Sequence, residues 1–307
     1  MAMVRTEVLS RESREPGRSE IGAALTLASR MPHLVLEARR VAASLAHGIH
    51  GRRRAGPGET FWQFRPFVAG ESASRVDWRR SGRDDRLYVR EREWEAPHSI
   101  WLWLDRSASM GFRSSLASAS KVERALVVGL ALAEAFVDGG ERIGLLGLRA
   151  PSASRAIAER LAEALAARES DLAEDLPPPA AAARQDEVIL IGDFLSPPGE
   201  VARRIEAIAA RGARGHLLLV VDPIEETFPL DGQAVLHDLE DGLRLRIGDA
   251  ASFARVYRDR MAAHRERLRE AVRRHGWTLT VHHTDRSAGE AALRLMTLVG
   301  GSRREAA

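Results

Sequence analysis

Short apolar runs of strand length alternate with helical periods from residue 99 onward. The runs lie at residues 99–104, 142–148, 187–191, 216–221 and 277–282. Helical periods lie between them, at residues 118–137, 153–168, 200–211 and 251–275. Strands that alternate with helices are typical of a parallel sheet with helices on both faces. The pattern therefore predicts an α/β fold, doubly wound and Rossmann-like, with a mostly parallel sheet.

Two regions depart from this alternation. Residues 233–239 and 243–247 alternate around Glu240-Asp241-Gly242, which predicts a β-hairpin. The first 98 residues hold one helical period, at residues 32–46, and then an irregular or β segment dense in aromatic, arginine and acidic residues. We therefore expect four parts: a disordered N-terminus (1–30), a segment that packs on the main domain (31–98), the α/β domain (99–300) and a short tail (301–307).

The composition narrows the chemistry that the chain can perform. It has no cysteine, which excludes disulfides, thiolate metal sites and cysteine nucleophiles. Lys121 is the only lysine, so any Schiff-base or phosphate-binding lysine must be this residue. Acidic and basic residues nearly balance, at 43 against 46, and the chain as a whole is therefore not a polycation.

No segment of the sequence is long and apolar enough to predict a membrane-spanning helix. The longest strongly apolar run, residues 125–133, is about half as long as a spanning helix requires. The charged N-terminus lacks the small-residue cleavage pattern of a secretory signal. Together with the absence of cysteine, these features predict a cytoplasmic protein.

The clearest candidate for a ligand site follows the first predicted strand, at Asp105-Arg106-Ser107-Ala108-Ser109. In an open α/β sheet, ligands bind beyond the carboxyl ends of the strands. A tight turn can direct the carboxylate of Asp105 and the hydroxyls of Ser107 and Ser109 at one divalent cation, and such oxygen ligands suit Mg²⁺ or Mn²⁺. The alternative is structural, because an Asp followed by Ser at a strand end also forms N-caps and Asx turns.

A second strand-end carboxylate favours the metal-site interpretation. Asp193 follows the strand predicted at residues 187–191, and a neighbouring parallel strand would bring it beside Asp105. Ser170-Asp171, after the helix predicted at residues 153–168, is a candidate source of a further hydroxyl or carboxylate ligand. With so few protein ligands, Mg²⁺ would keep waters and an open position, which an acidic side chain of a partner protein could fill.

Two other functions stay open as alternatives. The strand-end carboxylates could serve a magnesium-dependent phosphohydrolase, although Ser107 stands where an aspartyl-phosphate enzyme needs a second acid. Residues 30–95 hold fourteen arginines, which makes nucleic-acid binding an alternative function. The same stretch also holds nine acidic residues, which weaken its positive field. The Ser118-x-x-Lys121 match to serine acyl enzymes lacks the second lysine that this chemistry uses. We find no catalytic constellation and predict that the chain is not an enzyme.

Two stretches of the chain resemble the domain-of-unknown-function 58 (DUF58) family, whose members resemble von Willebrand factor A domains. The first stretch precedes the main domain and is similar to the family's signature: Glu59-Thr60-Phe61, Arg65, Gly70-Glu71, Arg75-Val76-Asp77-Trp78, Arg83 and Leu87-Tyr88-Val89-Arg90-Glu91. The second stretch, Asp105-Arg106-Ser107-Ala108-Ser109-Met110, is similar to the first loop of a metal-ion-dependent adhesion site. The resemblance extends over most of the chain.

The resemblance implies a sheet of von Willebrand factor A type and a metal held by Asp105, Ser107, Ser109 and Asp193. Ser170 stands where the family's site takes a threonine hydroxyl. The resemblance further implies a non-enzymatic adaptor that binds an acidic side chain of a protein partner. This adaptor would work with a MoxR-type AAA+ ATPase in the assembly or activation of other proteins. Four charged residues of the signature are expected to be structural and to brace it against the main domain: Arg75, Asp77, Arg83 and Arg90. The alternative is that the signature forms a surface for a partner.

Overall fold

The computed structural model describes most of the chain, namely residues 4–6, 19–50, 61–83, 86–92, 98–167, 175–179, 182–238 and 244–304. The chain forms two compact units. The larger unit comprises Met1–Gly48 and His98–Ala307, and the smaller unit comprises Ile49–Pro97. In the described part, no helix is both long enough and apolar enough to cross a membrane.

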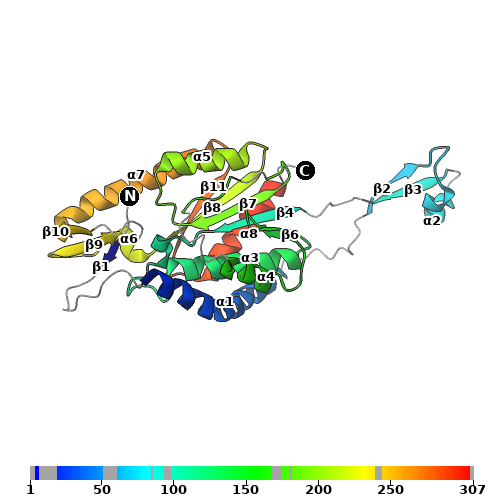
Figure 1. Ribbon diagram of the computed structural model, residues 1–307. Helices are drawn as coiled ribbons and strands as arrows, with labels where there is room; N and C mark the ends of the chain where they lie inside the picture. The colour runs from blue at the N-terminus through cyan, green and yellow to red at the C-terminus, as the bar shows by residue number, and fades with distance from the viewer. Residues whose placement is uncertain are drawn as a thin grey trace. The chain divides into compact units, whose positions relative to one another are not determined.

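A six-stranded sheet forms the centre of the larger unit (Figure 1). Its strands lie in the order β11–β8–β7–β4–β5–β6 and span Thr278–His283, Arg214–Val221, Glu187–Gly192, Ser99–Leu104, Arg142–Leu145 and Arg149–Ser152. The first five strands of this order are parallel, and β6 runs antiparallel beside β5. The prediction of a mixed α/β fold with a mostly parallel sheet is therefore confirmed.

One strand is shorter than the sequence predicts. We expected a single strand at residues 142–148, but β5 ends at Leu145 and the chain turns back into β6. Gly147 lies in the turn with a φ of 74°, in the left-handed region that glycine adopts without strain. The apolar run of the sequence continues through the turn because Leu146 is buried as well.

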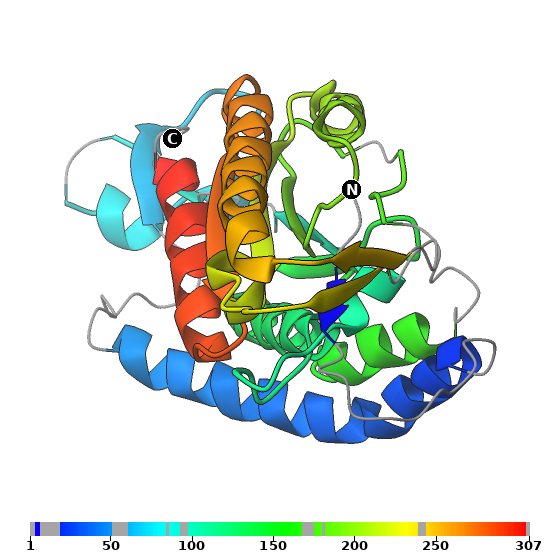
Figure 2. The same ribbon diagram turned by 90° about the vertical axis from the view of Figure 1, so that its left-hand side faces the viewer.

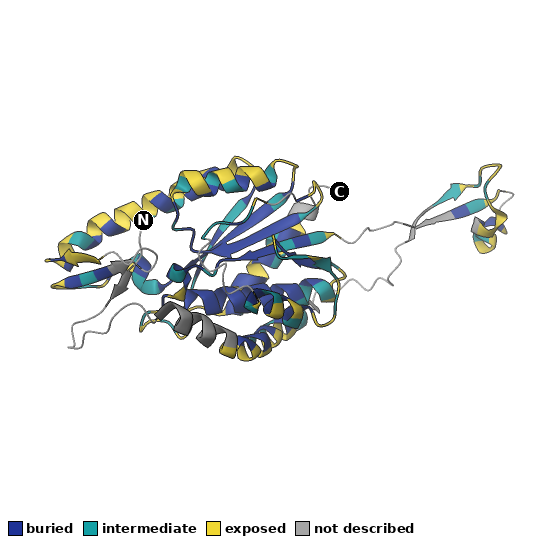
Figure 3. Ribbon diagram, in the orientation of Figure 1, coloured by how far each residue is buried: buried dark blue, intermediate teal, exposed yellow. Residues whose placement is uncertain are grey.

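Helices cover both faces of this sheet. One face packs against α3 (Lys121–Asp138), α4 (Ile157–Ala166) and α8 (Ala288–Arg304), and the other packs against α5 (Pro198–Ala209) and α7 (Ala250–Arg273). Alternate residues of β7 divide between the two faces: Ile189 and Ile191 join the first core, whereas Val188 and Leu190 join the second. Figure 3 shows the central strands as buried along most of their length. Burial on both faces explains why the sequence of β7 is apolar without alternation.

Helix α1 (Ser19–His50) is longer than the sequence predicts. We expected a helix at residues 32–46 after a disordered stretch at residues 1–30, but the helix begins at Ser19 and continues through Pro32. A proline inside a helix removes one hydrogen bond, and burial of the apolar face of α1 offsets that loss. This face joins the core on the side of α3 and α4 through Met31, Leu34, Val35, Ala38, Ala42 and Leu45.

A second sheet has three strands in the order β1–β9–β10 (Figure 2). Strands β9 (Ala234–Asp238) and β10 (Arg244–Ile247) are antiparallel, which confirms the predicted hairpin, although its turn lies outside the described residues. Strand β1 (Val4–Thr6) pairs with the other side of β9. The sheet packs on α7 through an apolar cluster that includes Phe228, Leu236, Ile247 and Tyr257.

The smaller unit contains a two-stranded antiparallel sheet and a short helix. Strand β2 (Phe61–Pro66) pairs with β3 (Tyr88–Arg92), and α2 (Trp78–Ser81) lies between them in the sequence. The guanidinium group of Arg80 lies over the ring of Tyr88, 4.5 Å from its centroid. Such a cation–π contact ties the short helix to the sheet of this unit.

Candidate functional site

The carboxyl ends of β4 and β7 meet where the strand order reverses. From β4 the chain moves to β5 on one side and later to β7 on the other. Such a reversal leaves a crevice at the carboxyl edge of the sheet, where α/β proteins bind ligands. Asp105 follows β4, and its backbone N–H donates to the carbonyl of Ile191 in β7 at 2.8 Å. Asp193 follows β7 directly, so the two strand-end aspartates are neighbours.

The strand-end site consists of Asp105, Ser107, Ser109 and Asp193. The backbone N–H of Ser107 donates to Oδ1 of Asp105 at 2.9 Å, which closes the turn. The two serine hydroxyls lie 3.2 Å apart, and that of Ser109 donates to Oδ2 of Asp193 at 2.7 Å. All four residues are buried. The structure thus brings together four of the five residues predicted to bind a metal, and the fifth, Ser170, lies outside the described residues.

One oxygen of the strand-end site lacks a hydrogen bond from the residues that the structure describes. This oxygen is Oδ2 of Asp105, and it is buried. Burial raises the pKa of Asp105 well above its usual value, the nearby Asp193 carboxylate raises it further, and the hydrogen bonds from Ser107 offset only part of this. Such a carboxyl group either keeps its proton or lies next to a cation. A cation held by Asp105, Ser107 and Ser109 would compensate this oxygen.

The donor set of the site is small for a metal centre. Among the residues that the structure describes, no three His, Cys, Asp or Glu side chains are grouped as metal ligands. A divalent ion would therefore depend on carboxylate and hydroxyl oxygens and on water. This donor set suits Mg²⁺ or Mn²⁺, which accept oxygen ligands and retain bound water.

Strained backbone follows Asp193. Phe194 is a buried, non-glycine residue with a φ of 48°, which places it in the left-handed region. Its ring packs against Trp103 of β4, with 5.9 Å between the centroids. Nε2 of His264, from α7, donates to its carbonyl at 2.8 Å. Contacts from two elements thus hold a strained turn that sets the direction of the Asp193 side chain.

Lys121, the only lysine of the chain, lies beside this site, a position that the sequence does not predict. Its side chain is fully buried, and its Nζ lies 2.7 Å from Oδ2 of Asp193 and 2.8 Å from Oε1 of Glu225. Lys121 is the first residue of α3, directly after the N-cap Ser120, which forms a capping box with Glu123. Because helical Cα–Cβ bonds tilt toward the N-terminus, the side chain extends past the helix end toward the sheet edge.

The charges around Lys121 do not balance. Burial opposes the charge of Lys121, but the Asp193 and Glu225 carboxylates outweigh it and raise the pKa of the ammonium group. Burial raises the pKa of Glu225 to about 7, and Lys121 offsets only part of this. Asp105, Asp193 and Glu225 are three carboxylates, and with one ammonium group they carry a formal charge of minus two when all are ionised.

A third strand-end aspartate, Asp222, lies near this site and is not among the predicted site residues. It follows β8 and caps the short helix α6 (Pro223–Thr227), which carries Glu225. Its carboxylate accepts hydrogen bonds from the backbone N–H groups of Ile224, at 3.0 Å, and of Ser114 in the loop after β4, at 2.9 Å. The signal was available, because Asp222 ends an apolar run in the same way as Asp105.

Two further contacts involve residues on either side of Ser170 in the sequence. The guanidinium group of Arg106 donates to the carbonyl of Leu165, near the end of α4, at 2.5 Å. On the other side of Ser170, the carboxylate of Asp175 accepts a hydrogen bond from the Ser196 hydroxyl, in the loop after β7. Residues on both sides of Ser170 therefore contact loops that also form the strand-end site.

The signature residues lie in the smaller unit. Arg65 forms a two-pronged ion pair with Glu71, at 2.5 and 2.9 Å, and Asp77 caps α2 by accepting from the N–H of Arg80 at 3.0 Å. Trp78 is 65% exposed, and Arg83 is exposed as well. These described contacts lie within the unit. The side chains of Arg75 and Arg90 are not among the described ones.

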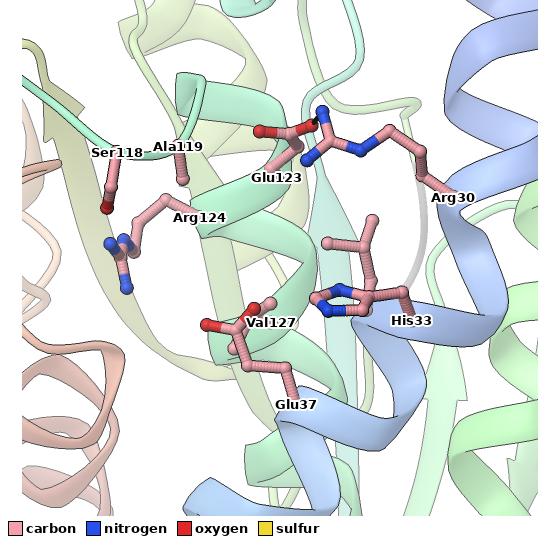
Figure 4. Close-up of a pocket in the computed structure, with 9 residues that line it drawn as sticks. Arg30, His33, Glu37, Ser118, Ala119, Glu123, Arg124 and Val127 are labelled. Atoms are coloured by element: carbon pink, nitrogen blue, oxygen red, sulfur yellow. Dashed lines mark ion pairs between the residues drawn. The ribbon is translucent and has the colours of Figure 1, made fainter.

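A small cavity of about 140 Å³ lies between α1 and α3 (Figure 4). Arg30 of α1 pairs with Glu123 of α3 across it. Arg124 donates to the carbonyl of Thr284 at 2.9 Å. The lining carries charges of both signs, so it does not select an ionic ligand, and its ion pair fixes α1 to α3.

Comparisons with known proteins found one matching family and distant structural neighbours. A family model described as "Protein of unknown function DUF58" matches residues 63–267, a range that includes most of the signature and the whole strand-end site. The chain is 28% identical over 280 residues to uncharacterized protein Rv1480 of Mycobacterium tuberculosis and to uncharacterized protein Mb1516 of Mycobacterium bovis. Each alignment covers 85% of this chain and 86% of the relative.

Two solved structures are similar over about two thirds of the chain. One is the conserved hypothetical protein BatB from Bacteroides thetaiotaomicron, with 16% identity and a TM-score of 0.38 over 66% of this chain and 99% of that one. The other is an aerotolerance-related membrane protein from Bacteroides fragilis, with 15% identity and a TM-score of 0.37 over 64% of this chain and 97% of that one.

Proposed function

The chain belongs to the DUF58 family, and we propose that it is a non-enzymatic interaction module whose larger unit is of von Willebrand factor A type. Its binding surface is the carboxyl edge of the large sheet, around the strand-end site. There it recognises an acidic side chain of a partner protein with the help of Mg²⁺ or Mn²⁺. Function on such a fold depends on the site and not on the fold alone.

The partnerless oxygen of Asp105 is the observation that carries this proposal. A buried carboxylate oxygen without a hydrogen bond is costly unless a proton or a cation compensates it. The hydroxyls of Ser107 and Ser109 converge on the same side of the loop, and together these groups would hold the ion. When bound, the ion supplies a positive charge with an open coordination position, which suits a carboxylate from the partner.

Cooperation with a MoxR-type AAA+ ATPase, in the assembly or activation of other proteins, is part of the proposal and rests on the family resemblance. The chain offers two surfaces for two partners. The strand-end site would bind the acidic client, and the smaller unit, with its exposed Trp78, is available to the ATPase. An exposed tryptophan is frequent at protein interfaces because it adds a large contact area at a low entropic cost.

Calorimetric titration with Mg²⁺ and Mn²⁺ tests the metal-dependent part. The wild-type protein should show saturable binding, and Asp105→Asn should abolish it while the protein stays folded. Asp259→Asn removes an exposed carboxylate of α7 and serves as the matched control, with binding unchanged. Equal affinity in the wild type and Asp105→Asn would contradict the proposed site.

Pull-down of acidic partners tests the adaptor part. Capture by the wild-type protein in Mg²⁺ should be lost in chelator and in Asp105→Asn, but retained in Asp259→Asn. A purified MoxR-type ATPase should be captured by the intact chain in both conditions if it binds the smaller unit. Loss of ATPase binding in Trp78→Ala alone would identify that unit as the docking surface.

A further inference from the structure

Lys121 is placed where lysines are rarely found. Its side chain has no exposed surface, although lysine is among the residues least often buried without a partner. The first turn of α3 holds the residue in place, and the ring of Phe112 lies 5.9 Å from Nζ. A buried ammonium group requires compensation, and two carboxylates provide it, one after β7 and one in α6.

These carboxylates belong to different parts of the site. Asp193 comes from the end of β7 and is one of the strand-end residues, whereas Glu225 comes from α6, after β8. Oδ2 of Asp193 accepts both from Nζ of Lys121 and from the hydroxyl of Ser109, each at 2.7 Å. One oxygen of Asp193 is therefore engaged twice within the protein, while the neighbouring Asp105 keeps an oxygen that no described residue contacts through a hydrogen bond.

We propose that the ammonium group of Lys121 is a built-in cation of the strand-end site, which neutralises Asp193 and so restricts a divalent ion to the Asp105 side. The inference rests on the proposed metal site and specifies how that site is tuned. The ammonium group and a divalent cation are both positive, and they repel strongly at the short distances of this buried cluster. Lys121 therefore keeps the affinity for the metal alone low, and the carboxylate of the partner supplies the charge that Asp193 does not.

The same ammonium group ties α6 to α3. Without Lys121, Glu225 would be a buried carboxylate. Among the described residues it would then accept a hydrogen bond only from the backbone N–H of Asp222, at 3.0 Å. The adjacent Glu226 pairs with Arg265 of α7 at 2.6 Å and with His283 of β11. A purely structural role for Lys121 is therefore the competing explanation, and the experiment must separate it from a role in metal affinity.

Three variants separate the two roles by charge. Lys121→Met removes the ammonium group and changes the formal charge of the cluster from minus two to minus three. The double variant Lys121→Met/Glu225→Gln removes one charge of each sign, so the total stays at minus two while Asp193 loses its ion pair. Lys121→Arg keeps the positive charge and is the conservative control.

Metal affinity at pH 8, measured by calorimetry, is the first readout, and thermal unfolding with and without Mg²⁺ is the second. The double variant should bind Mg²⁺ and Mn²⁺ at least about ten-fold more tightly than the wild type, and Mg²⁺ should raise its unfolding temperature more. Lys121→Met should bind these ions at least as tightly as the double variant, and Lys121→Arg should bind them like the wild type. If Lys121→Met does not fold, the charge-conserving double variant still gives the answer.

The outcomes distinguish this inference from the proposed function. If the double variant folds and binds no more tightly than a wild-type protein that does bind metal, Lys121 is only structural, and the proposed metal site stands. If the wild type binds no metal but the double variant does, the built-in cation is supported and unaided metal binding is refuted. If neither binds metal, both ideas are wrong.

Discussion

Replacing Glu225 with glutamine should make the stability of the protein less dependent on pH. Glu225 is buried in α6 and faces Lys121 of α3, Asp193 after β7 and Tyr257 of α7. Glutamine has the shape of a protonated glutamate and cannot ionise. The variant therefore removes the titration of one buried carboxyl group and leaves its packing in place.

The structure sets the magnitude and the sign. The pKa of Glu225 is about 7 in the folded protein, against an ordinary value of 4.5. Between these values the unfolded chain has released a proton that the folded protein still binds, so stability falls as the pH rises through this window and stays lower above it. A difference of about 2.5 pH units, at about 1.4 kcal/mol each, corresponds to about 3 kcal/mol.

Denaturation with urea at pH 4.5 and at pH 8, in chelator, measures this difference. Relative to the wild type, Glu225→Gln should gain about 3 kcal/mol of unfolding free energy between the two pH values. Glutamine and the protonated glutamate differ in the hydrogen bonds they can form, and this offset of about 1 kcal/mol is the same at both pH values. Glu163→Gln, an exposed position on α4, is the control. A Glu225→Gln curve parallel to the wild-type curve would refute the assignment of a raised pKa.

Three further substitutions, two of them paired with a control substitution, test the packing of the larger unit by urea denaturation. Gly192→Ala should destabilise the protein by about 1–3 kcal/mol and weaken metal binding, because a Cβ there would lie 2.7 Å from Cβ and 2.8 Å from Oδ2 of Asp105; wild-type metal affinity would argue against a tight site. Leu34→Ala should cost about 2–5 kcal/mol, whereas Leu36→Ala, 56% exposed, should change stability by less than about 0.5 kcal/mol; equal effects would mean that α1 is not part of the core. Gly215→Ala should cost about 3 kcal/mol or more, because its Cβ would lie 2.1 Å from the ring of Trp277, whereas Gly199→Ala meets open space and should be neutral or stabilising.

The larger unit could be predicted from the sequence because its signals are local. Five apolar runs became the strands β4, β5, β7, β8 and β11, and four helical periods became α3, α4, α5 and α7. The antiparallel strand β6 was missed because an apolar residue, Leu146, continues the run of β5 through the turn. Helix α8 has buried residues at a helical spacing, Ala288, Ala291, Ala292, Leu295 and Val299, so its sequence contains a signal as clear as that of α4.

Part of the candidate site could be predicted for the same reason. Asp105 and Asp193 end two apolar runs, and parallel strands place such residues at one edge of the sheet. The position of Lys121 could not be predicted, because a lysine at the first position of a helix is usually exposed. Its burial depends on α6 and on the turn after β7 meeting at the end of α3, which is a property of the tertiary structure. The described contacts of the signature residues lie within the smaller unit, such as the ion pair of Arg65 with Glu71.

The three strand-end aspartates show how identical positions acquire different chemistry. Asp222 receives backbone N–H groups from Ile224 and Ser114, so its charge is satisfied by fixed dipoles. Asp193 receives an ammonium group and a hydroxyl on one oxygen. Asp105 receives hydrogen bonds from Ser107, and its Oδ2 receives none from the described residues. Capacity for an external cation therefore falls on Asp105. Because no described hydrogen bond uses Oδ2, Asp105→Asn can remove metal binding without removing a hydrogen bond at that atom.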